Sequence, residues 1–362
     1  MMRMPNDVSI AGQARIGGKR PALARSFSRL GLLPALHSVR RLLRGDLRIL
    51  TYHRVLDIDP AKFDFDRALV SASAEQFREQ MAYVKKCFQP MRFRDVLEHL
   101  DEGRPLPRDA LIITFDDGYD DNYRVAFSIL RELGLPATFF VSTGHIDTGQ
   151  PYAYDWLVYM LMRTPATHVE LPEIDLTLSL PPSREGREAV GADLLDRLKL
   201  LDDDRQSSLI GRLEQIWSMP RRPHPDCRPM TWDQLREMHA SGMEIGSHGV
   251  DHRMLAQLPV AAMRAEVSES RATLERELGV APEVLSYPVG GSNAFSADVI
   301  EALKAEKFRI GCSYISGSNR LPLGDLYALQ RLPVEQYIDQ DWFCGMLVSP
   351  ELFSHRKRQR SG

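Results

Sequence analysis

The sequence predicts an α/β protein, a parallel barrel of seven strand–helix units interrupted by one helical insertion. Short apolar runs rich in β-branched and aromatic residues recur seven times, and amphipathic helical patterns separate most of them. One long stretch, residues 150–228, breaks this alternation. The chain has 362 residues, which is enough for a single large domain of this kind.

The predicted strands and helices alternate along the chain, which indicates parallel strand pairing. The strands are Leu47–His53, Leu111–Phe115, Pro136–Ser142, Met243–His248, Val284–Pro288, Phe308–Tyr314 and Tyr327–Leu332. The helices are Ala74–Lys86, Phe93–Glu102, Asn122–Leu133, Thr231–Ala240, Val260–Leu278 and Ser296–Glu306. Ser296 is a suitable N-cap for the last helix, and Gly134 and Gly279 are suitable C-terminal residues for theirs.

The insertion, residues 150–228, contains an apolar helical run, a proline-rich polar segment and a charged helix around Asp193–Trp217. A long insertion in a barrel usually lies over one face, so we expect a lid or a substrate wall. Trp156 either stacks against a sugar or packs in the core, and its helical spacing favours the core.

The two ends of the chain differ from the middle in charge. We divide the sequence into a basic extension (1–46), the barrel (47–340) and a C-terminal tail (341–362). Residues 1–48 hold ten Lys or Arg and two Asp or Glu, a balance of +8, whereas the remainder sums to 36 − 47 = −11.

Residues 1–25 are polar and are predicted to be disordered. Residues 28–45 are basic and partly amphipathic; they either touch an anionic membrane or pack on the barrel, and packing is favoured.

Composition excludes several classes of protein. The formal charge is 46 − 49 = −3, so no nucleic-acid partner is expected. The sequence contains no run of 18 apolar residues and no recognisable signal peptide, and its 4 cysteines are far apart. We therefore predict a cytoplasmic protein without disulfides, with peripheral contact at the inner membrane as the alternative location.

Two adjacent carboxylates, Asp116 and Asp117, follow the strand Leu111–Phe115 directly in the motif TFDDG. Like charges at close range repel, so folding alone gives no reason for this pair, whereas a metal ion or a shared proton does. The alternative is a solvated turn in which an aspartate caps the next helix. Asp120 or Asp121 is already expected to serve that cap, so the alternative leaves the pair unexplained.

His248 and His252 are spaced four apart, again after a predicted strand. On a helical turn this spacing would place both imidazoles on one face, able to bind one metal ion. Alone, such a pair is more often a surface feature. Together with one aspartate it forms a set of three ligands, which leaves open positions for water and substrate and is typical of a catalytic metal site.

Two further strand ends carry candidate residues. In SYPVGGSN, around Tyr287, Val289 and Gly290, the glycines let the backbone approach a ligand, and free N–H groups would bind an oxyanion. An ordinary loop is the competing interpretation, and local sequence favours it. His53 ends the first strand, where barrel enzymes gather catalytic groups, although a lone histidine is more often structural.

The order of TFDDG, the histidine pair and a Pro-x-Gly strand end resembles the polysaccharide deacetylase domain (NodB homology, carbohydrate esterase family 4) over about residues 47–335. The resemblance implies a distorted (β/α)7 barrel in which Asp116 is the general base. It implies that Asp117, His248 and His252 hold one divalent metal ion. Zinc is the default for this ligand set, and Ni, Co, Fe and Mn also suit it.

The sequence departs from the family pattern in three places. Gly249 replaces a usual Ser or Thr, Ser286 replaces a usual Arg, and no final strand carries Leu-x-x-His, since LFSH (352–355) lies in the basic tail. The last two departures resemble the branch that acts on poly-N-acetylglucosamine and related exopolysaccharides. In that branch the barrel is circularly permuted and a Tyr-His pair supplies the acid, which here corresponds to Tyr52–His53.

The missing arginine at Ser286 leads to a further prediction. In the family that arginine keeps the base ionised, so a replacement cation is expected near Asp116. Arg331 ends the last predicted strand, which a barrel places beside the first, so it would reach both Asp116 and His53. The alternative is a surface arginine before Pro333.

The sequence therefore predicts removal of N-acetyl groups from an amino-sugar polysaccharide, in exopolysaccharide or cell-envelope glycan biosynthesis. One alternative is a deacylase of a lipid-linked or small amino sugar, and the other is a catalytically silent glycan-binding module.

Overall fold

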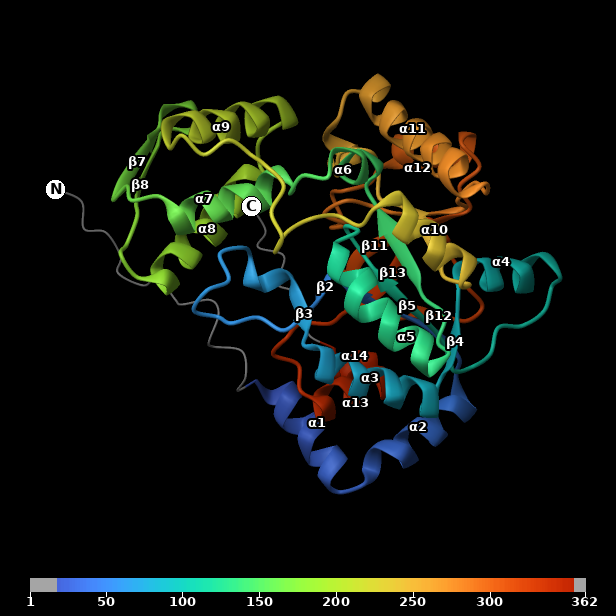
Figure 1. Ribbon diagram of the computed structural model, residues 1–362. Helices are drawn as coiled ribbons and strands as arrows, with labels where there is room; N and C mark the ends of the chain where they lie inside the picture. The colour runs from blue at the N-terminus through green and yellow to red at the C-terminus, as the bar shows by residue number, and fades with distance from the viewer. Residues whose placement is uncertain (1–17, 355–362) are drawn as a thin grey trace.

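The computed structural model describes residues 18–354, and its centre is a closed parallel barrel (Figure 1). Strand β1 pairs with β5 on one side and with β13 on the other, and this double pairing closes the ring. In chain order the barrel strands are β1 (Asp46–Tyr52), β5 (Ala110–Phe115), β6 (Thr138–Val141), β9 (Glu244–Ser247), β10 (Val284–Ser286), β11 (Ile310–Ser316) and β13 (Leu329–Pro333). All seven predicted strands are thus confirmed.

Shorter strands flank the barrel and were not predicted. Strand β4 (Gln89–Met91) pairs with β5, and β12 (Asn319–Arg320) pairs antiparallel with β1. A separate pair joins β2 (Arg54–Val55) to β3 (Val70–Ala72). These strands have two or three residues each, too few to produce a recognisable alternation in the sequence.

The predicted helices surround the barrel. They are α3 (Ala74–Cys87), α4 (Phe93–Asp101), α10 (Trp232–Ala240), α11 (Val260–Leu278) and α12 (Ala297–Ala305), together with α5 (Ser128–Leu133), which is preceded by wider π-type turns at Asn122–Phe127. A short helix, α6 (Thr143–Thr148), follows β6. Ser296 caps α12 by accepting a bond from the Val299 N–H, and Gly134 and Gly279 end their helices in the left-handed conformation, as predicted.

The insertion forms a lobe with its own hydrophobic core (Figure 1). It consists of α7 (Ala153–Arg163), the hairpin β7 (His168–Leu171) and β8 (Leu176–Ser179), α8 (Arg184–Leu198) and α9 (Asp203–Ile216). Phe63 and Phe65, from the loop after β2, complete this core. Trp156 is only 1% exposed, and its indole N–H donates to the Met219 carbonyl at 2.9 Å. Trp156 is therefore a core residue and cannot be a sugar platform.

The N-terminal extension is helical where it is described. Helices α1 (Lys19–Arg29) and α2 (Leu32–Leu43) pack against α13 (Gln340–Val348) and bury Ala24 and Leu33. The prediction of disorder is therefore wrong for residues 19–25, because contacts with the end of the chain stabilise a helix whose composition is polar. Residues 1–17 lie outside the described part.

The segment predicted as a tail is folded up to Ser354. Helix α13 and the short α14 (Pro350–Phe353) bury Trp342, Phe343 and Phe353 against the barrel. Residues 341–354 are therefore packed helices rather than a free tail, and His355 of LFSH lies outside the described residues. Among residues 18–354, no helix is long and apolar enough to cross a membrane.

Candidate metal centre and active site

Three side chains that follow two barrel strands form a cluster suited to a metal ion. One ligand atom from each of Asp117, His248 and His252 lies within 4.8 Å of the other two. The Asp117 Oδ1 atom is 3.4 Å from His248 Nε2 and 3.3 Å from His252 Nε2. Two imidazoles and one carboxylate suit a divalent transition metal, and a set of three protein ligands leaves coordination positions open.

The turn after β5 has an uncommon backbone conformation. Asp117 and Gly118 both have φ of 73°, in the left-handed region. A Cβ atom at Gly118 would lie 3.0 Å from Val141 Cγ1, so glycine is required there for space as well as for conformation. The Asp117 carbonyl accepts a hydrogen bond from the Tyr152 hydroxyl at 2.8 Å, which holds this strained residue in place.

The orientation of His248 is fixed by the neighbouring strand. Its Nδ1 atom lies 2.7 Å from the Ser286 carbonyl oxygen, and because a carbonyl can only accept, Nδ1 carries the proton. This tautomer leaves the lone pair of Nε2 directed toward Asp117. Hydrogen bonding of the second ring nitrogen in this way is the usual arrangement for a metal-bound histidine.

The two histidines lie on a loop, so the prediction of a helical turn is wrong. Gly249 and His252 have φ of 78° and 58°, which no helix allows. The buried carboxylate of Glu266, on α11, accepts from the N–H groups of Val250 and Asp251 at 2.7 and 3.1 Å and so holds the loop. A Cβ atom at residue 249 would lie 2.8 Å from Glu266 Oε2, which explains why glycine replaces the usual Ser or Thr.

Asp116 is buried beside the cluster and is paired with Arg331. The two guanidinium nitrogens donate to the two carboxylate oxygens at 2.8 Å each, and Nη2 also donates to Ser286 Oγ at 2.9 Å. Burial by itself would raise the pKa of Asp116, but the Arg331 guanidinium together with His248 and His53 outweighs it and holds that pKa below its ordinary value. The small side chain of Ser286 therefore occupies the place where the family arginine is usual, and an arginine from β13 supplies the charge.

The aspartates expected to cap the following helix have other roles. Asp121 accepts from the Arg54 guanidinium at 2.9 Å and from the Val55 N–H at 2.9 Å, which ties the turn after β5 to β2. Asp120 accepts from Arg228 and Gln234 at 2.9 Å each. Neither side chain caps the helix, because the arginines around them are stronger partners.

The candidate acid, His53, follows β1 at the same end of the barrel. Its N–H donates to Ser71 Oγ at 3.0 Å and its carbonyl accepts from Asn122 Nδ2 at 2.8 Å, so its backbone is fixed on both sides. The half-buried imidazole lies with its centroid 5.5 Å from the Tyr314 ring. It is also close enough to Asp116 to contribute to the lowering of that pKa, after Arg331 and His248.

The loop after β10 contains the residues predicted to bind the oxyanion or the substrate, and the structure places them differently. Val289 and Gly290 adopt left-handed conformations, with φ of 65° and 62°, and Val289 is 40% exposed. The Gly290 carbonyl accepts from the Tyr314 N–H at 2.6 Å, which anchors the loop. Tyr287, predicted as a substrate contact, instead donates its hydroxyl to the Tyr327 carbonyl at 2.8 Å and is buried, so that assignment is wrong.

The start of the insertion lies against the metal ligands. The Tyr152 and Tyr154 rings have centroids 5.2 and 5.4 Å from the His252 ring. Asp155, on the first helix of the insertion, is buried and accepts a hydrogen bond from the Tyr119 hydroxyl at 2.8 Å. Burial raises the pKa of Asp155 to about 7. Sequence reasoning missed both tyrosines and Glu266, because no spacing relates them to the histidines.

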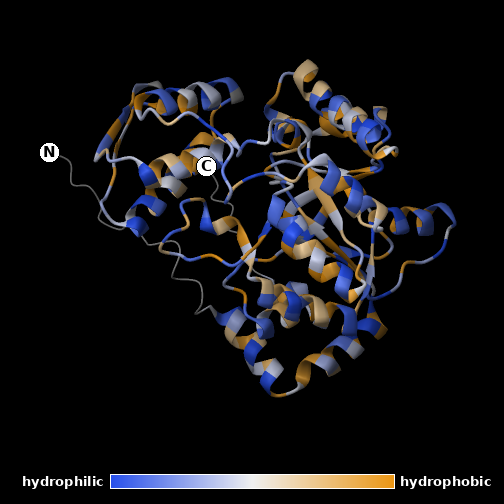
Figure 2. Cartoon of the chain, in the orientation of Figure 1, coloured by the Kyte–Doolittle hydropathy of each residue, from blue (hydrophilic) through white to orange (hydrophobic). Residues whose placement is uncertain are grey.

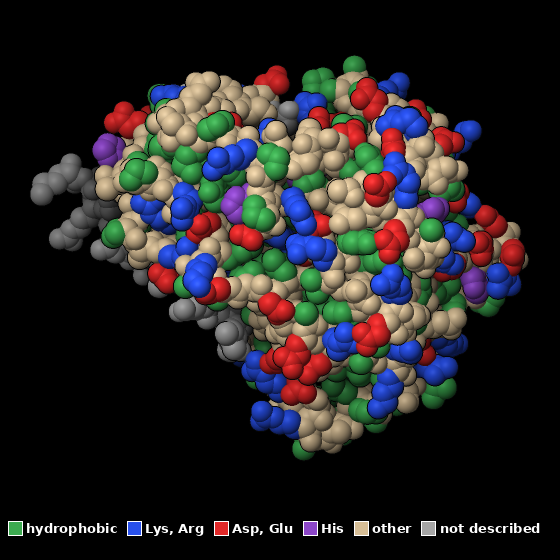
Figure 3. Space-filling model, viewed as in Figure 1, with side chains coloured by type: hydrophobic (Ala, Val, Ile, Leu, Met, Phe, Trp, Pro, Cys, Tyr) green, Lys and Arg blue, Asp and Glu red, His purple; other side chains and the backbone are tan. Residues whose placement is uncertain are grey.

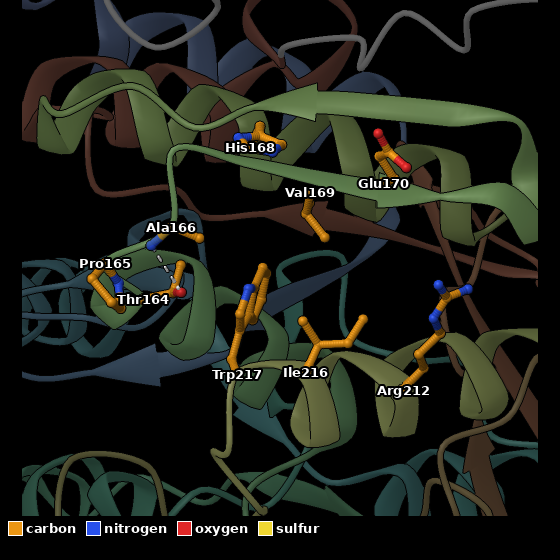
Figure 4. Close-up of a pocket in the computed structure, with 9 residues that line it drawn as sticks. All are labelled: Thr164, Pro165, Ala166, His168, Val169, Glu170, Arg212, Ile216 and Trp217. Atoms are coloured by element: carbon orange, nitrogen blue, oxygen red, sulfur yellow. Dashed lines mark hydrogen bonds between the residues drawn. The ribbon is translucent and has the colours of Figure 1, made fainter.

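A surface pocket of about 630 Å³ lies within the insertion, between β7 and α9 (Figure 4). Figure 4 shows the Trp217 ring standing between Ala166 on one side and Ile216 on the other. The Trp217 ring is partly exposed, and an exposed aromatic face is the kind of surface on which sugars stack. However, none of the residues that line the pocket is a candidate metal ligand, base or acid, so we assign it no part in the chemistry.

The Arg331 pairing leads to a prediction about pH. Arg331→Ala should raise the pKa of Asp116, and since Asp116 must be ionised to act as a base, the acid limb of the pH–rate profile should move to higher pH. Arg331→Lys keeps the charge and should shift the limb less. The alanine variant leaves a buried carboxylate unpaired, at a cost of roughly 3–5 kcal/mol in stability, so its melting temperature must be measured alongside. An unchanged profile in a folded alanine variant would remove Arg331 from the site.

The Tyr152 hydroxyl leads to a prediction about metal affinity. Tyr152→Phe removes the bond to the Asp117 carbonyl but keeps the ring, so zinc affinity should fall by about 10- to 100-fold, the usual cost of losing an outer-shell partner. Zinc titration by calorimetry measures this directly. Tyr159→Phe, on the helix that follows Tyr152, is the matched control, because that ring packs against Phe65 and Trp156. Equal affinities in the two variants would show that the Tyr152 bond is irrelevant to the site.

Comparison with known proteins places this geometry in a family. A sequence model described as "Polysaccharide deacetylase" matches residues 103–309, more than half of the chain. The match contains Asp116, Asp117 and both histidines, but it begins after His53 and ends before Arg331.

A curated relative is the poly-β-1,6-N-acetyl-D-glucosamine N-deacetylase of Escherichia coli (strain K12), 33% identical over 84 residues. That match covers 23% of this chain and 12% of the relative. Among solved structures, the Streptococcus pyogenes deacetylase PplD is similar with a TM-score of 0.56 and 17% identity, covering 85% of this chain and all of that one. IcaB from Ammonifex degensii is similar with a TM-score of 0.50 and 18% identity, covering 84% and 99% of the two chains. The fold is shared with these two solved structures, and the chain belongs to the polysaccharide deacetylase family of hydrolases.

Proposed function

We propose that the protein is a metal-dependent N-deacetylase that removes acetyl groups from an amino-sugar polysaccharide during exopolysaccharide or cell-envelope glycan biosynthesis. The single observation that carries this proposal is the cluster of Asp117, His248 and His252 beside a second carboxylate, Asp116, which Arg331 keeps ionised. A metal site next to a separate base is the arrangement that amide hydrolysis with water as the nucleophile needs.

The chemistry divides between the metal ion and the base. A divalent ion held by the cluster would act as a Lewis acid toward the acetamide carbonyl and lower the pKa of the attacking water. Asp116 accepts the proton from that water, because its carboxylate is unprotonated at neutral pH and its oxygens are oriented by Arg331. The bond from carbonyl carbon to water oxygen forms first, and the bond from carbon to nitrogen then breaks.

The departing nitrogen needs a proton, and we assign this step to His53. The fixed backbone of His53 after β1 holds its imidazole next to the Tyr314 ring. The N–H groups of Val289 and Gly290 are the candidate donors to the oxyanion, since their left-handed conformations turn the backbone of this exposed loop. The products are acetate and a free amino sugar.

The insertion is proposed as one wall of the substrate groove. Its first helix presents Tyr154, which is partly exposed and lies beside the His252 ring. A tyrosine ring at the edge of a metal site offers an apolar face to a sugar and a hydroxyl to its substituents. This role is taken by Tyr154 in place of Trp156, which is buried.

The choice of a polysaccharide as substrate is supported by the name of the Escherichia coli relative and by the Tyr52–His53 pair. A deacylase of lipid-linked or small amino sugars would use the same site with a different groove. A silent glycan-binding module would not need a metal cluster together with a paired base.

Acetate release from purified protein tests the proposal. The panel should contain oligomers of β-1,6-linked and β-1,4-linked N-acetylglucosamine and the monosaccharide, each with and without a chelator followed by zinc. We expect release from an oligomer, loss with chelator and recovery with zinc. Release only from the monosaccharide would favour the small-substrate alternative, and glycan binding without release or stoichiometric metal would favour the silent module.

A further inference from the structure

The hairpin of α1 and α2 exposes an unusual concentration of large apolar side chains. Leu30, Leu42 and Leu43 are 71%, 79% and 80% exposed. Leu23, Leu32 and Val39 on the same hairpin are also exposed, so six of the thirteen exposed large hydrophobic residues in the described chain lie within residues 23–43. Scattered exposed leucines need no explanation, but a contiguous group on one projecting element indicates a contact surface.

Helix α2 packs Leu33 against the domain and leaves a second apolar face exposed. Toward the barrel, His37 lies 3.1 Å from Asp109, and Arg40 pairs with Asp46 and Glu351. Toward solvent, Leu32, Val39, Leu42 and Leu43 form one stripe at helical spacing. A surface helix of a soluble domain normally carries charged and polar residues on its solvent face. Figure 2 shows the hydrophobic colour along α2 and at the turn before it.

The hairpin itself is cationic. Residues 19–45 contain seven Lys or Arg and no Asp or Glu. Four of the seven pair with acidic residues elsewhere in the chain, namely Arg25, Arg40, Arg41 and Arg44. Lys19 and Arg29 make no ion pair with any residue in 18–354. At the far end of α2, Arg108 donates to the carbonyls of Arg41 and Leu42.

The exposed Arg320 adds a further positive charge near the C-terminal end of α2, because β12 places it opposite Asp46 at the start of β1. In Figure 3, the lower edge of the molecule, over α1 and α2, carries scattered blue basic and green hydrophobic side chains next to a red acidic group. Leucines bordered by arginines match the two layers of an anionic membrane surface, in which acyl chains lie beneath charged headgroups.

We propose that the α1–α2 hairpin docks the protein on an anionic lipid bilayer, with its exposed leucines in the interface and its arginines against the headgroups. A second copy of the chain fits this surface poorly, because a two-fold dimer would place the cationic hairpin opposite itself. Figure 1 shows the hairpin at the lower edge, far from α6 and the insertion, which flank the candidate active site. The site thus stays accessible on a docked molecule. This inference goes beyond the proposed function and does not depend on it.

Vesicle co-sedimentation of the full chain tests the docking surface. The vesicles are pure phosphatidylcholine or phosphatidylcholine with about one third phosphatidylglycerol. Wild type should bind the anionic vesicles at least tenfold more tightly than the neutral ones, since basic residues near the surface are attracted to the anionic headgroups. Leu42→Ser with Leu43→Ser should weaken binding by about 100-fold, from the loss of two buried leucines. Arg29→Glu with Arg320→Glu should weaken it by tenfold or more, and only at low salt.

Matched controls separate docking from general effects. Leu200 lies in the insertion and is 82% exposed, so Leu200→Ser removes an equally exposed leucine far from the hairpin in sequence. Arg222→Glu reverses an exposed charge in the same insertion. Both should bind like wild type, and all variants should keep the wild-type melting temperature. Wild type that fails to bind anionic vesicles, hairpin variants that bind as well as wild type, or equal binding to neutral vesicles would each overturn the proposal. A dimer in solution that Leu42→Ser with Leu43→Ser dissociates would overturn it in favour of self-association.

Discussion

Alanine at Asp117, His248 or His252 is expected to abolish metal binding and deacetylase activity together. Within residues 18–354 these three side chains form the candidate metal cluster, so the loss of one leaves two, and an open site with two ligands holds a divalent ion poorly. Elemental analysis of the purified variants gives the metal content, and acetate release gives the activity. Activity should fall to the background of the assay in all three.

A matched control distinguishes ligand loss from a general effect of histidine removal. His168→Ala changes an exposed histidine in the insertion and should keep full metal content and activity. Wild-type metal content in any of the three ligand variants would show that the ion is bound elsewhere. Loss of activity in His168→Ala would show that the histidines act through stability.

Asp116→Asn is expected to retain the metal and to lower kcat by about 10²- to 10⁴-fold, the usual contribution of general acid–base catalysis. Asparagine has nearly the same shape, but its neutral amide cannot accept a proton from water at neutral pH. The side-chain oxygen can still accept from Arg331, so the fold should survive. Steady-state kinetics and metal content are measured on the same preparation.

The control for this variant is Asp147→Asn, which neutralises an exposed aspartate on α6 that accepts from the Trp232 indole N–H. It should leave kcat unchanged. Turnover near wild type in Asp116→Asn would mean that another group activates the water. Loss of metal in that variant would mean that Asp116 is a ligand rather than the base.

The sequence by itself determined the barrel. Its seven strands could be predicted because each is a short apolar run buried on both faces, and the helix ends could be predicted because Ser296, Gly134 and Gly279 act through local geometry. The order of motifs also singled out Asp116, Asp117, His248 and His252, since adjacent charges at strand ends have no purpose in folding.

Tertiary structure alone decided how these residues are held. Arg331 and Asp116 are 215 positions apart, and they meet because the last strand closes against the first. Tyr152 reaches Asp117 from the insertion, and Glu266 reaches the histidine loop from α11. Hydrogen bonds of this kind depend on where whole elements pack, and they leave no periodicity in the sequence.

The ends of the chain show the same division. Composition predicted disorder for residues 19–25, but packing between α1 and α13 ordered them, because burial against a distant segment supplies free energy that local propensity does not contain. The histidine loop was predicted as a helical turn, since spacing of four is the helical spacing. Gly249 and the buried Glu266 carboxylate instead fix it as a loop, which only the folded chain could show.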